Sequence, residues 1–157
     1  MKQIQTWLDE YGESHQNPLN KKIHWICVPL IMLSTIGLFW SIPHNYFPET
    51  GLGFSFNWGI ILILITVLFY LRLSFMMFLG MAFTGFILIL VNLWLINNID
   101  FPLWKTSLLI FIPAWIGQFI GHKIEGKKPS FLQDIQFLLI GPAWLLSFIF
   151  IKLGIRY

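Results

Sequence analysis

The sequence predicts an all-α protein, a polytopic membrane helix bundle that forms a single integral-membrane domain over residues 1–157. Two observations support this prediction. Hydrophobic residues make up 57% of the chain and charged residues only 11%, with a mean hydropathy of +0.73, which is unlike an ordinary soluble domain. Apolar stretches also recur along the chain, and polar or Gly/Pro-rich segments separate them. We therefore expect about five transmembrane helices, near 25–42, 54–71, 73–96, 103–121 and 137–151.

The N-terminal segment 1–22 is polar and precedes the first span. It has no apolar core or cleavage site of a secretory signal, so we expect the first span itself to direct insertion. The apolar residues Trp7, Leu8 and Tyr11 give it an amphipathic pattern, which predicts an interfacial helix. Asn17 followed by Pro18 is typical of a helix N-cap and first helical residue. A new helix is therefore expected to begin at Pro18 and lead into the first span.

The stretch 54–96 is expected to fold back on itself. It holds one charged residue, Arg72, and as a single helix it would be about twice as long as the ~30 Å hydrocarbon core is thick. The segment YLRLS, residues 70–74, is the predicted turn. Before the last span, Ser130 and Gln133 have capping-box spacing, which predicts an interfacial helical turn there.

The basic residues predict the orientation. With five spans, the N-terminal segment, the Arg72 turn and the loop 122–136 share one side, and the C-terminus lies on the other. The first side holds seven Lys and Arg residues and the second holds three, Lys105, Lys152 and Arg156. Because basic residues favour the cytoplasmic side, we expect an integral membrane protein with a cytoplasmic N-terminus.

Composition excludes several functional classes. The single cysteine, Cys27, cannot form an intrachain disulfide and lies in an apolar run. A net charge of +3, from residues that flank the spans, does not indicate a nucleic-acid partner. The chain has neither the G-x-S-x-G motif of serine hydrolases nor a glycine-rich phosphate-binding loop. The apolar composition predicts that membrane lipid surrounds the protein. The sequence does not specify an oligomeric state.

Three of the four histidines are expected on one side of the membrane. His15 and His24 precede or open the first span and His122 closes the fourth, whereas His44 lies on the other side. A continuous helix would place His15 and His24 on opposite faces, but the break at Pro18 lets His15 fold back towards His24. A single histidine at a helix end is also explained as a cation that complements the helix dipole. Three together predict a metal site on the cytoplasmic side.

The end of the fourth span presents a second part of this pattern. Gln118, His122 and Glu125 are spaced by four and three residues, so they share one helical face. Three neutral imidazoles suit a divalent transition metal, and open coordination positions make iron(II) the chemically interesting ion. Gln118, Asn20 and Asp134 are candidates to orient the histidines. Glu125 is either a fourth ligand or a proton acceptor, or it pairs with a lysine.

These residues resemble a known family. The first motif has the form Y-x3-H-x4-N-x3-H-x3-VP, which here is Tyr11, His15, Asn20, His24, Val28 and Pro29. The second begins with QFIGH and continues to a glutamate and a proline, which here are Gln118, Gly121, His122, Glu125 and Pro129. The two motifs, in this order, resemble the 2-hydroxy fatty acid dioxygenase family, small multispan proteins of fungal alpha-oxidation with many bacterial relatives. The similarity covers nearly the whole chain, and the bacterial relatives make a bacterial inner membrane the location that the resemblance implies.

The resemblance implies an enzyme and a reaction. It implies an Fe2+-dependent dioxygenase that uses dioxygen to cleave a long-chain 2-hydroxy fatty acid to the acid one carbon shorter. His15, His24 and His122 are then the expected iron ligands, with Glu125, Asn20 and Gln118 as candidate catalytic residues. The lysines after His122 either attract the anionic headgroup or only mark the cytoplasmic side.

Two other functions remain open at this point. His24 and His122 on different helices are also compatible with a bis-histidine haem protein that transfers electrons. A small transporter or structural membrane protein, whose histidines only line a polar cavity, is the second alternative.

Overall fold

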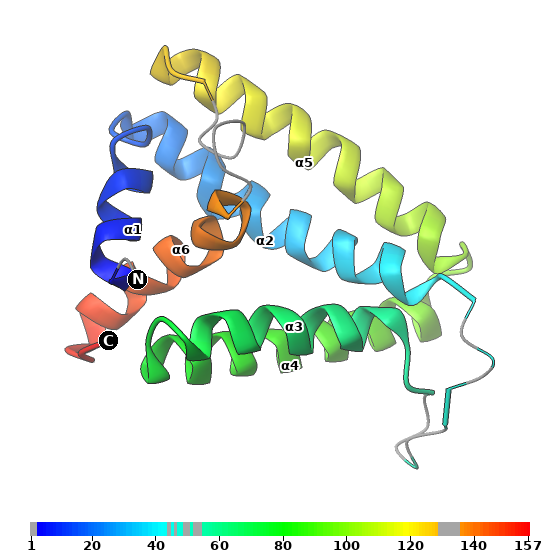
Figure 1. The fold of residues 1–157 in the computed structure, drawn as a ribbon. Helices are drawn as coiled ribbons and strands as arrows, with labels where there is room; N and C mark the ends of the chain where they lie inside the picture. The colour runs from blue at the N-terminus through cyan, green and yellow to red at the C-terminus, as the bar shows by residue number, and fades with distance from the viewer. Residues whose placement is uncertain (1–2, 44, 46, 49–50, 52–54, 129–135) are drawn as a thin grey trace.

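In the residues that it describes, the computed structural model contains six α-helices (Figure 1). It describes residues 3–43, 45, 47–48, 51, 55–128 and 136–157. The helices are α1 (Ile4–Gly12), α2 (Pro18–Trp40), α3 (Trp58–Leu71), α4 (Phe75–Asn98), α5 (Leu103–Glu125) and α6 (Phe137–Leu153). No strand of a sheet joins them within the described ranges, so the predicted all-α class is confirmed.

Among the described helices, α2 and α5 pack against each other most extensively. Two glycines on α5 allow their close approach. A Cβ atom at Gly117 would lie 2.6 Å from the Cys27 sulfur, and one at Gly121 would lie 2.4 Å from the Asn20 side-chain oxygen. Glycines four residues apart form one small strip on a helix, which permits tight packing between membrane helices. The packing brings the first turns of α2 beside the last turns of α5.

The predicted cap and turn are both present. The Asn17 side chain accepts a hydrogen bond of 2.8 Å from the Leu19 backbone N–H, and Pro18 is the first residue of α2. Helices α3 and α4 form a hairpin around Arg72, and Ser74 caps α4 by accepting from the Met77 N–H. The stretch 54–96 therefore folds back at the predicted place.

Helix α6 departs from the predicted arrangement. It does not run alongside the other helices but lies obliquely at the end of the bundle that carries α1 (Figure 1). Trp144 packs against Tyr11 of α1, and Phe137 packs edge-on against Trp7. Both termini consequently lie at the same end of the bundle, whereas five through-going spans would place the C-terminus at the opposite end. The structure thus differs from the predicted five-span arrangement, and the membrane side of the C-terminus stays a prediction.

Among the described residues, three helices are long and apolar enough to cross a membrane, namely α2, α4 and α5. Helix α3 has 14 residues, which corresponds to about 21 Å against a hydrocarbon core of about 30 Å. Helix α6 has 17 residues and buries side chains on several sides. A polytopic bundle is consistent with this structure, but a count of five spans does not follow from it. The predicted interfacial turn at Ser130 and Gln133, and Asp134 with it, lie outside the described residues.

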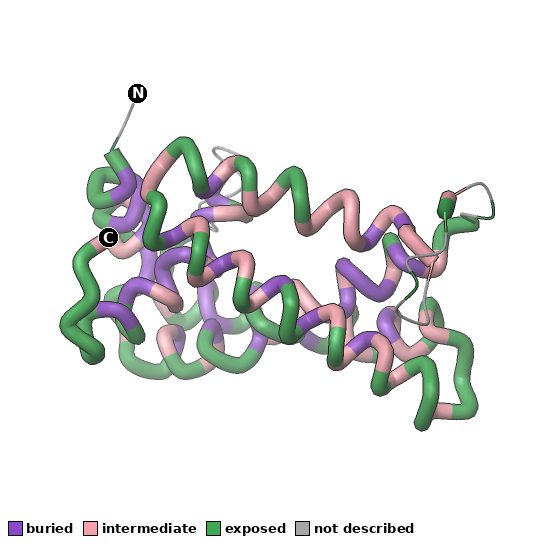
Figure 2. Tube along the Cα trace, turned by 90° about the horizontal axis from the view of Figure 1, so that it is seen from below, coloured by how far each residue is buried: buried purple, intermediate pink, exposed green. Residues whose placement is uncertain are grey.

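Two separate cores stabilise the bundle. The larger joins α1 and α6 to the adjoining ends of the α3–α4 hairpin, around Tyr70, Met77 and Ile140. The smaller lies towards the other end and is built on Ile36, Trp40 and Leu88. Figure 2 shows buried segments gathered at the two ends of the bundle, with more exposed segments between them. The space between the two cores is where the cavity described below lies.

Candidate metal centre

Three histidines from three different segments meet in the structure. His15 lies in the connection between α1 and α2, His24 lies on α2, and His122 lies in the last turn of α5. All three are buried, with exposed fractions of 0%, 0% and 4%. One ring nitrogen from each lies within 4.8 Å of the others, so the group could hold a metal ion. His44, the remaining histidine, lies outside the described residues.

The break before Pro18 lets His15 fold back, as the sequence predicts. The ring of His15 stacks on Tyr11 with centroids 4.1 Å apart, and its Nδ1–H donates to the Tyr11 carbonyl at 2.7 Å. Burial, reinforced by His24, lowers the pKa of His15 to about 3. The ring is therefore neutral at physiological pH and has a lone pair on Nε2.

His24 and His15 face each other through their Nε2 atoms. The Nδ1–H of His24 donates to the Asn20 carbonyl at 3.0 Å, so its neutral ring also has a lone pair on Nε2. The two Nε2 atoms are 2.9 Å apart. Two lone pairs at this distance repel unless a cation lies beside both, and burial disfavours a proton on His15. A metal ion satisfies both nitrogens.

His122 completes the group from the opposite helix. Its ring centroid lies 4.9 Å from that of His15 and 5.0 Å from that of His24. Its Nδ1 is a buried nitrogen with no hydrogen-bond partner in the described structure. A buried polar atom without a partner costs about 1–3 kcal/mol, so such atoms indicate a strain or a missing ligand.

The donor set fits a divalent transition metal. Imidazole is a preferred ligand of iron, zinc, copper and nickel. Two nitrogens bound at right angles to one ion, with bonds of about 2.1 Å, would lie about 3.0 Å apart, close to the 2.9 Å between His15 and His24. Three protein ligands leave coordination positions for a substrate, as catalytic metal sites require.

The Glu125 carboxylate is not part of the group of three histidines that could hold the metal ion. One carboxylate oxygen accepts from the Gln16 backbone N–H at 2.7 Å. The other accepts from the Asn17 N–H and from the Asn20 side-chain amide, both at 2.9 Å. The carboxylate therefore ties the end of α5 to the segment that holds His15.

The other two candidate catalytic residues contact the site differently. The backbone carbonyl of Asn20 orients His24, and the Asn20 side chain, fully buried, bonds Glu125. Gln118 lies one helical turn before His122 and lines the cavity beside it. Asp134, the third candidate for orienting the histidines, lies outside the described residues.

The structure adds residues that the sequence reasoning did not assign to the site. Tyr11 belongs to the family motif but was not placed against a histidine by its spacing alone. Trp144 of α6, with its ring centroid 5.2 Å from that of His15, has no signal in the sequence. Lys127 donates from its ammonium group to the Glu13 carbonyl at 2.7 Å, so this lysine also holds the N-terminal segment against α5.

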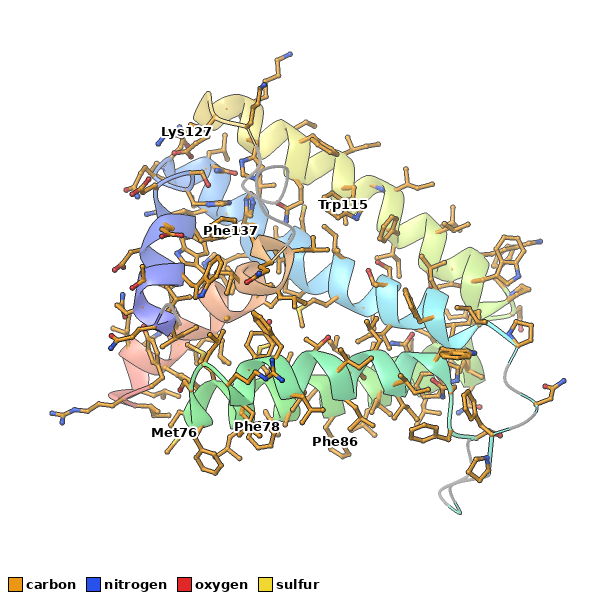
Figure 3. All side chains as sticks on the ribbon, viewed as in Figure 1. Met76, Phe78, Phe86, Trp115, Lys127 and Phe137 are labelled. Atoms are coloured by element: carbon orange, nitrogen blue, oxygen red, sulfur yellow. The ribbon has the colours of Figure 1, made fainter. Side chains whose placement is uncertain are left out.

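An apolar cavity of about 310 Å³ lies inside the bundle beside the histidine group, and His122 is one of its lining residues. His122, Gln118 and Tyr11 lie at one end of it, and side chains from α2 to α6 form its walls. Figure 3 shows two of these wall residues, Trp115 of α5 and Phe137 of α6, whereas Met76 and Phe86 of α4 point outwards. The arrangement suits a ligand with one metal-binding end and a long apolar body.

Comparison with known proteins agrees with this geometry. The model of the Mpo1-like family, described as 2-hydroxy-palmitic acid dioxygenase Mpo1-like, matches residues 1–153. The chain belongs to this family. The resemblance inferred from the two histidine motifs is thereby confirmed.

A curated relative extends the comparison. The chain is 28% identical over 153 residues to the 2-hydroxy-palmitic acid dioxygenase MPO1 of Saccharomyces cerevisiae, covering 96% of this chain and 82% of the yeast protein. The name of the relative indicates dioxygenase chemistry on a 2-hydroxy fatty acid. Its source is a yeast, so it gives no support to the expected bacterial inner membrane. No solved structure matches the chain.

Proposed function

We propose that this protein is an iron(II)-dependent dioxygenase that cleaves a long-chain 2-hydroxy fatty acid to the fatty acid one carbon shorter. The observation that supports this most directly is the meeting of His15, His24 and His122 beside an apolar cavity that His122 helps to line. Family membership and the yeast relative supply the class of substrate. The reaction balances without a further reductant when the carboxyl carbon leaves as carbon dioxide together with one water.

The three histidines would hold the iron, and iron(II) bound there would supply the redox chemistry that dioxygen requires. The chain positions the substrate around that ion. The hydroxyl and carboxylate of a 2-hydroxy acid lie at the histidines, and the tail enters the cavity. Gln118 lies where its amide can hydrogen-bond the substrate headgroup beside His122.

Glu125 acts in this proposal as a positioning residue. Both of its oxygens already accept hydrogen bonds from N–H groups of the N-terminal segment. Metal ligation or proton acceptance would need the carboxylate to leave these donors. Its proposed role is to keep His15 against the other two histidines.

The proposed site lies on the cytoplasmic side. Of the nine described Lys and Arg residues, only Lys105 lies at the far end of the bundle. The other eight are in the first turn of α2, in the turn at Arg72, at the end of α5 and in the C-terminal part of the chain. Since α6 brings Lys152 and Arg156 to the histidine end, the bias is stronger than the five-span arrangement predicts.

The bis-histidine haem alternative is disfavoured by packing. The His15 ring lies 4.3 Å from His24 and 4.9 Å from His122 between centroids. A macrocycle between His24 and His122 would need the space that His15 fills. Haem binding would also give an intense Soret band, which a histidine-iron(II) site does not.

The decisive experiment is mass spectrometry of 2-hydroxy-palmitic acid incubated with purified protein, iron(II) and air. We expect the acid one carbon shorter with the wild type, and its loss in His15→Ala, His24→Ala and His122→Ala. His44→Ala, which removes the remaining histidine, is the matched control and should retain activity.

Three other results would contradict the proposal. Full activity in the His122→Ala variant would remove the histidine group from the reaction. Stoichiometric iron without product from any chain length would leave a metal protein with another substrate. Protein that binds no metal and tolerates His15→Ala would favour the transporter or structural alternative.

A further inference from the structure

The cavity beside the histidines extends towards the smaller core, and its lining residues identify the side chains at that end. Ile36 of α2 and Leu88 of α4 both line the cavity. Both also belong to the smaller core, in which they pack with Trp40. Within the described part of the chain, this core therefore lies beside the cavity at the end away from His122, where it could act as a floor.

The walls between the histidines and this floor suit an alkyl chain. They come from α2, α3, α4, α5 and α6 and are formed mainly by aliphatic and aromatic side chains, including Val28, Val67, Met81 and Phe111. Thr66 also lines the cavity, but its hydroxyl donates to the Leu62 carbonyl at 2.8 Å within α3. Its polarity is thereby satisfied inside its own helix.

The distance along α2 from the histidine group to Ile36 can be compared with the length of a fatty acid. Ile36 follows His24 by 12 residues on α2, which is about 18 Å along the helix axis. An extended alkyl chain with C–C bonds of about 1.5 Å advances about 1.25 Å per carbon. The distance therefore accommodates about 14 carbons beyond the headgroup, which matches a 2-hydroxy acid of about 16 carbons.

We propose that Leu88, together with Ile36, is the floor that limits the length of the substrate tail and so sets the chain-length preference of the site. This inference rests on the proposed function for the identity of the headgroup. Leu88 is buried, with 8% of its surface exposed, and it faces the cavity across from Ile36.

Selection at this floor works by exclusion. A tail outside the cavity lies in lipid, which is as apolar as the cavity itself, so each added methylene gains little by entering. A tail longer than the cavity must instead displace packed side chains. Overpacking of this kind costs about 1–3 kcal/mol, which corresponds to a roughly five- to 150-fold loss for chains that exceed the limit.

The test uses two substitutions of opposite sense at Leu88 and the same two at Leu90. Leu90 lies on the same helix but is 49% exposed, so it does not face the cavity. Turnover is measured for 2-hydroxy acids of about 12 to 20 carbons, a range that extends to both sides of the estimated limit of about 16 carbons. The readout is the ratio of long-chain to short-chain turnover within each variant, because a general loss of stability lowers both equally.

We expect Leu88→Ala to raise the long-to-short ratio by at least fivefold and Leu88→Phe to lower it by a similar factor. The Leu90→Ala and Leu90→Phe ratios should equal that of the wild type. An unchanged ratio in both Leu88 variants, or equal shifts at Leu88 and Leu90, would overturn the inference.

A binding measurement separates this inference from the proposed reaction. Unreactive saturated fatty acids of the same lengths are used to displace a fluorescent fatty acid from each variant. A length optimum that moves with Leu88 and not with Leu90 supports the floor even if no 2-hydroxy acid is converted, and the proposed reaction alone then fails. Turnover by the wild type with no movement of the optimum in either assay leaves the reaction in place and excludes the floor.

Discussion

The side-chain amide of Asn20 donates a hydrogen bond of 2.9 Å to the carboxylate of Glu125, which joins the first turn of α2 to the last turn of α5. The same carboxylate accepts from two backbone N–H groups just before α2. His15 lies directly before these donors in the chain and has no helix of its own to hold it. The position of the first histidine therefore depends on a residue 110 positions later in the sequence.

Removing the Glu125 carboxylate should weaken metal binding. Glu125→Ala leaves three N–H donors without their acceptor, so the segment with His15 keeps only the bond from Lys127 to the Glu13 carbonyl as a described attachment to the end of α5. Residues that orient metal ligands in this way typically contribute 10- to 100-fold to affinity, and we expect a loss of about that size. Titration of the metal-free protein with iron(II) or cobalt(II) measures it directly.

The matched control for that prediction is Glu13→Gln. Glu13 is exposed in the same segment, and only its backbone carbonyl contacts α5, through Lys127. The Glu13→Gln substitution removes one negative charge but leaves the Glu125 carboxylate as the acceptor. Metal affinity should therefore stay within about twofold of the wild type, since exposed charges contribute little. Equal losses in Glu125→Ala and Glu13→Gln would show that charge, and not the hydrogen bonds, is responsible.

Gly121 should not tolerate a methyl group. In Gly121→Ala the new Cβ would lie 2.4 Å from the Asn20 side-chain oxygen, and Asn20 cannot move without losing its bond to Glu125. We expect a decrease of about 1–3 kcal/mol in the free energy of unfolding, measured by denaturant titration in detergent. In Gly12→Ala the Cβ would lie at an ordinary contact distance of 3.5 Å from Trp144, so this variant should unfold like the wild type.

Features that depend on nearby residues were predictable from the sequence. The cap at Asn17 and the turn at Arg72 follow from side-chain chemistry within a few positions, and the break at Pro18 permits the return of His15 to His24. The oblique position of α6 was not predictable in this way. An apolar helix can face lipid or protein, and hydropathy alone does not distinguish the two.

In the site too, features set by neighbouring residues could be predicted from the sequence, whereas features set by contacts between distant segments could not. The spacing of His122 and Glu125 predicts that both lie at the end of α5. It does not distinguish a Glu125 that binds a metal from a Glu125 that holds the segment with His15. Which role fits depends on where the N–H groups of residues 16 and 17 lie, over 100 positions away. Trp144 beside His15 likewise follows only from the packing of α6 against α1.

The Tyr11 ring should matter more than its hydroxyl. The ring stacks on His15 and contacts Phe137 and Trp144, and these contacts remain in Tyr11→Phe. Tyr11→Phe should therefore keep metal affinity and thermal stability close to those of the wild type. Tyr11→Ala removes a buried aromatic ring, and we expect unfolding to become easier by about 3 kcal/mol together with weaker metal binding. Loss of metal binding in Tyr11→Phe would instead assign a role to the hydroxyl.

Metal binding should stabilise the fold, because the site joins three segments that are far apart in the chain. A ligand that binds only the folded state at a hundredfold excess over its Kd adds about 2.7 kcal/mol. We expect iron(II), or cobalt(II) as a redox-stable substitute, to raise the Tm of the wild type and of His44→Ala, with one ion bound per chain. In His15→Ala, His24→Ala and His122→Ala the added metal should leave the Tm unchanged, because two remaining imidazoles no longer enclose the ion. An equal rise in Tm for the wild type and all three variants would place the metal elsewhere in the molecule. The close approach of the His15 and His24 Nε2 atoms would then need a cause other than a shared metal ion.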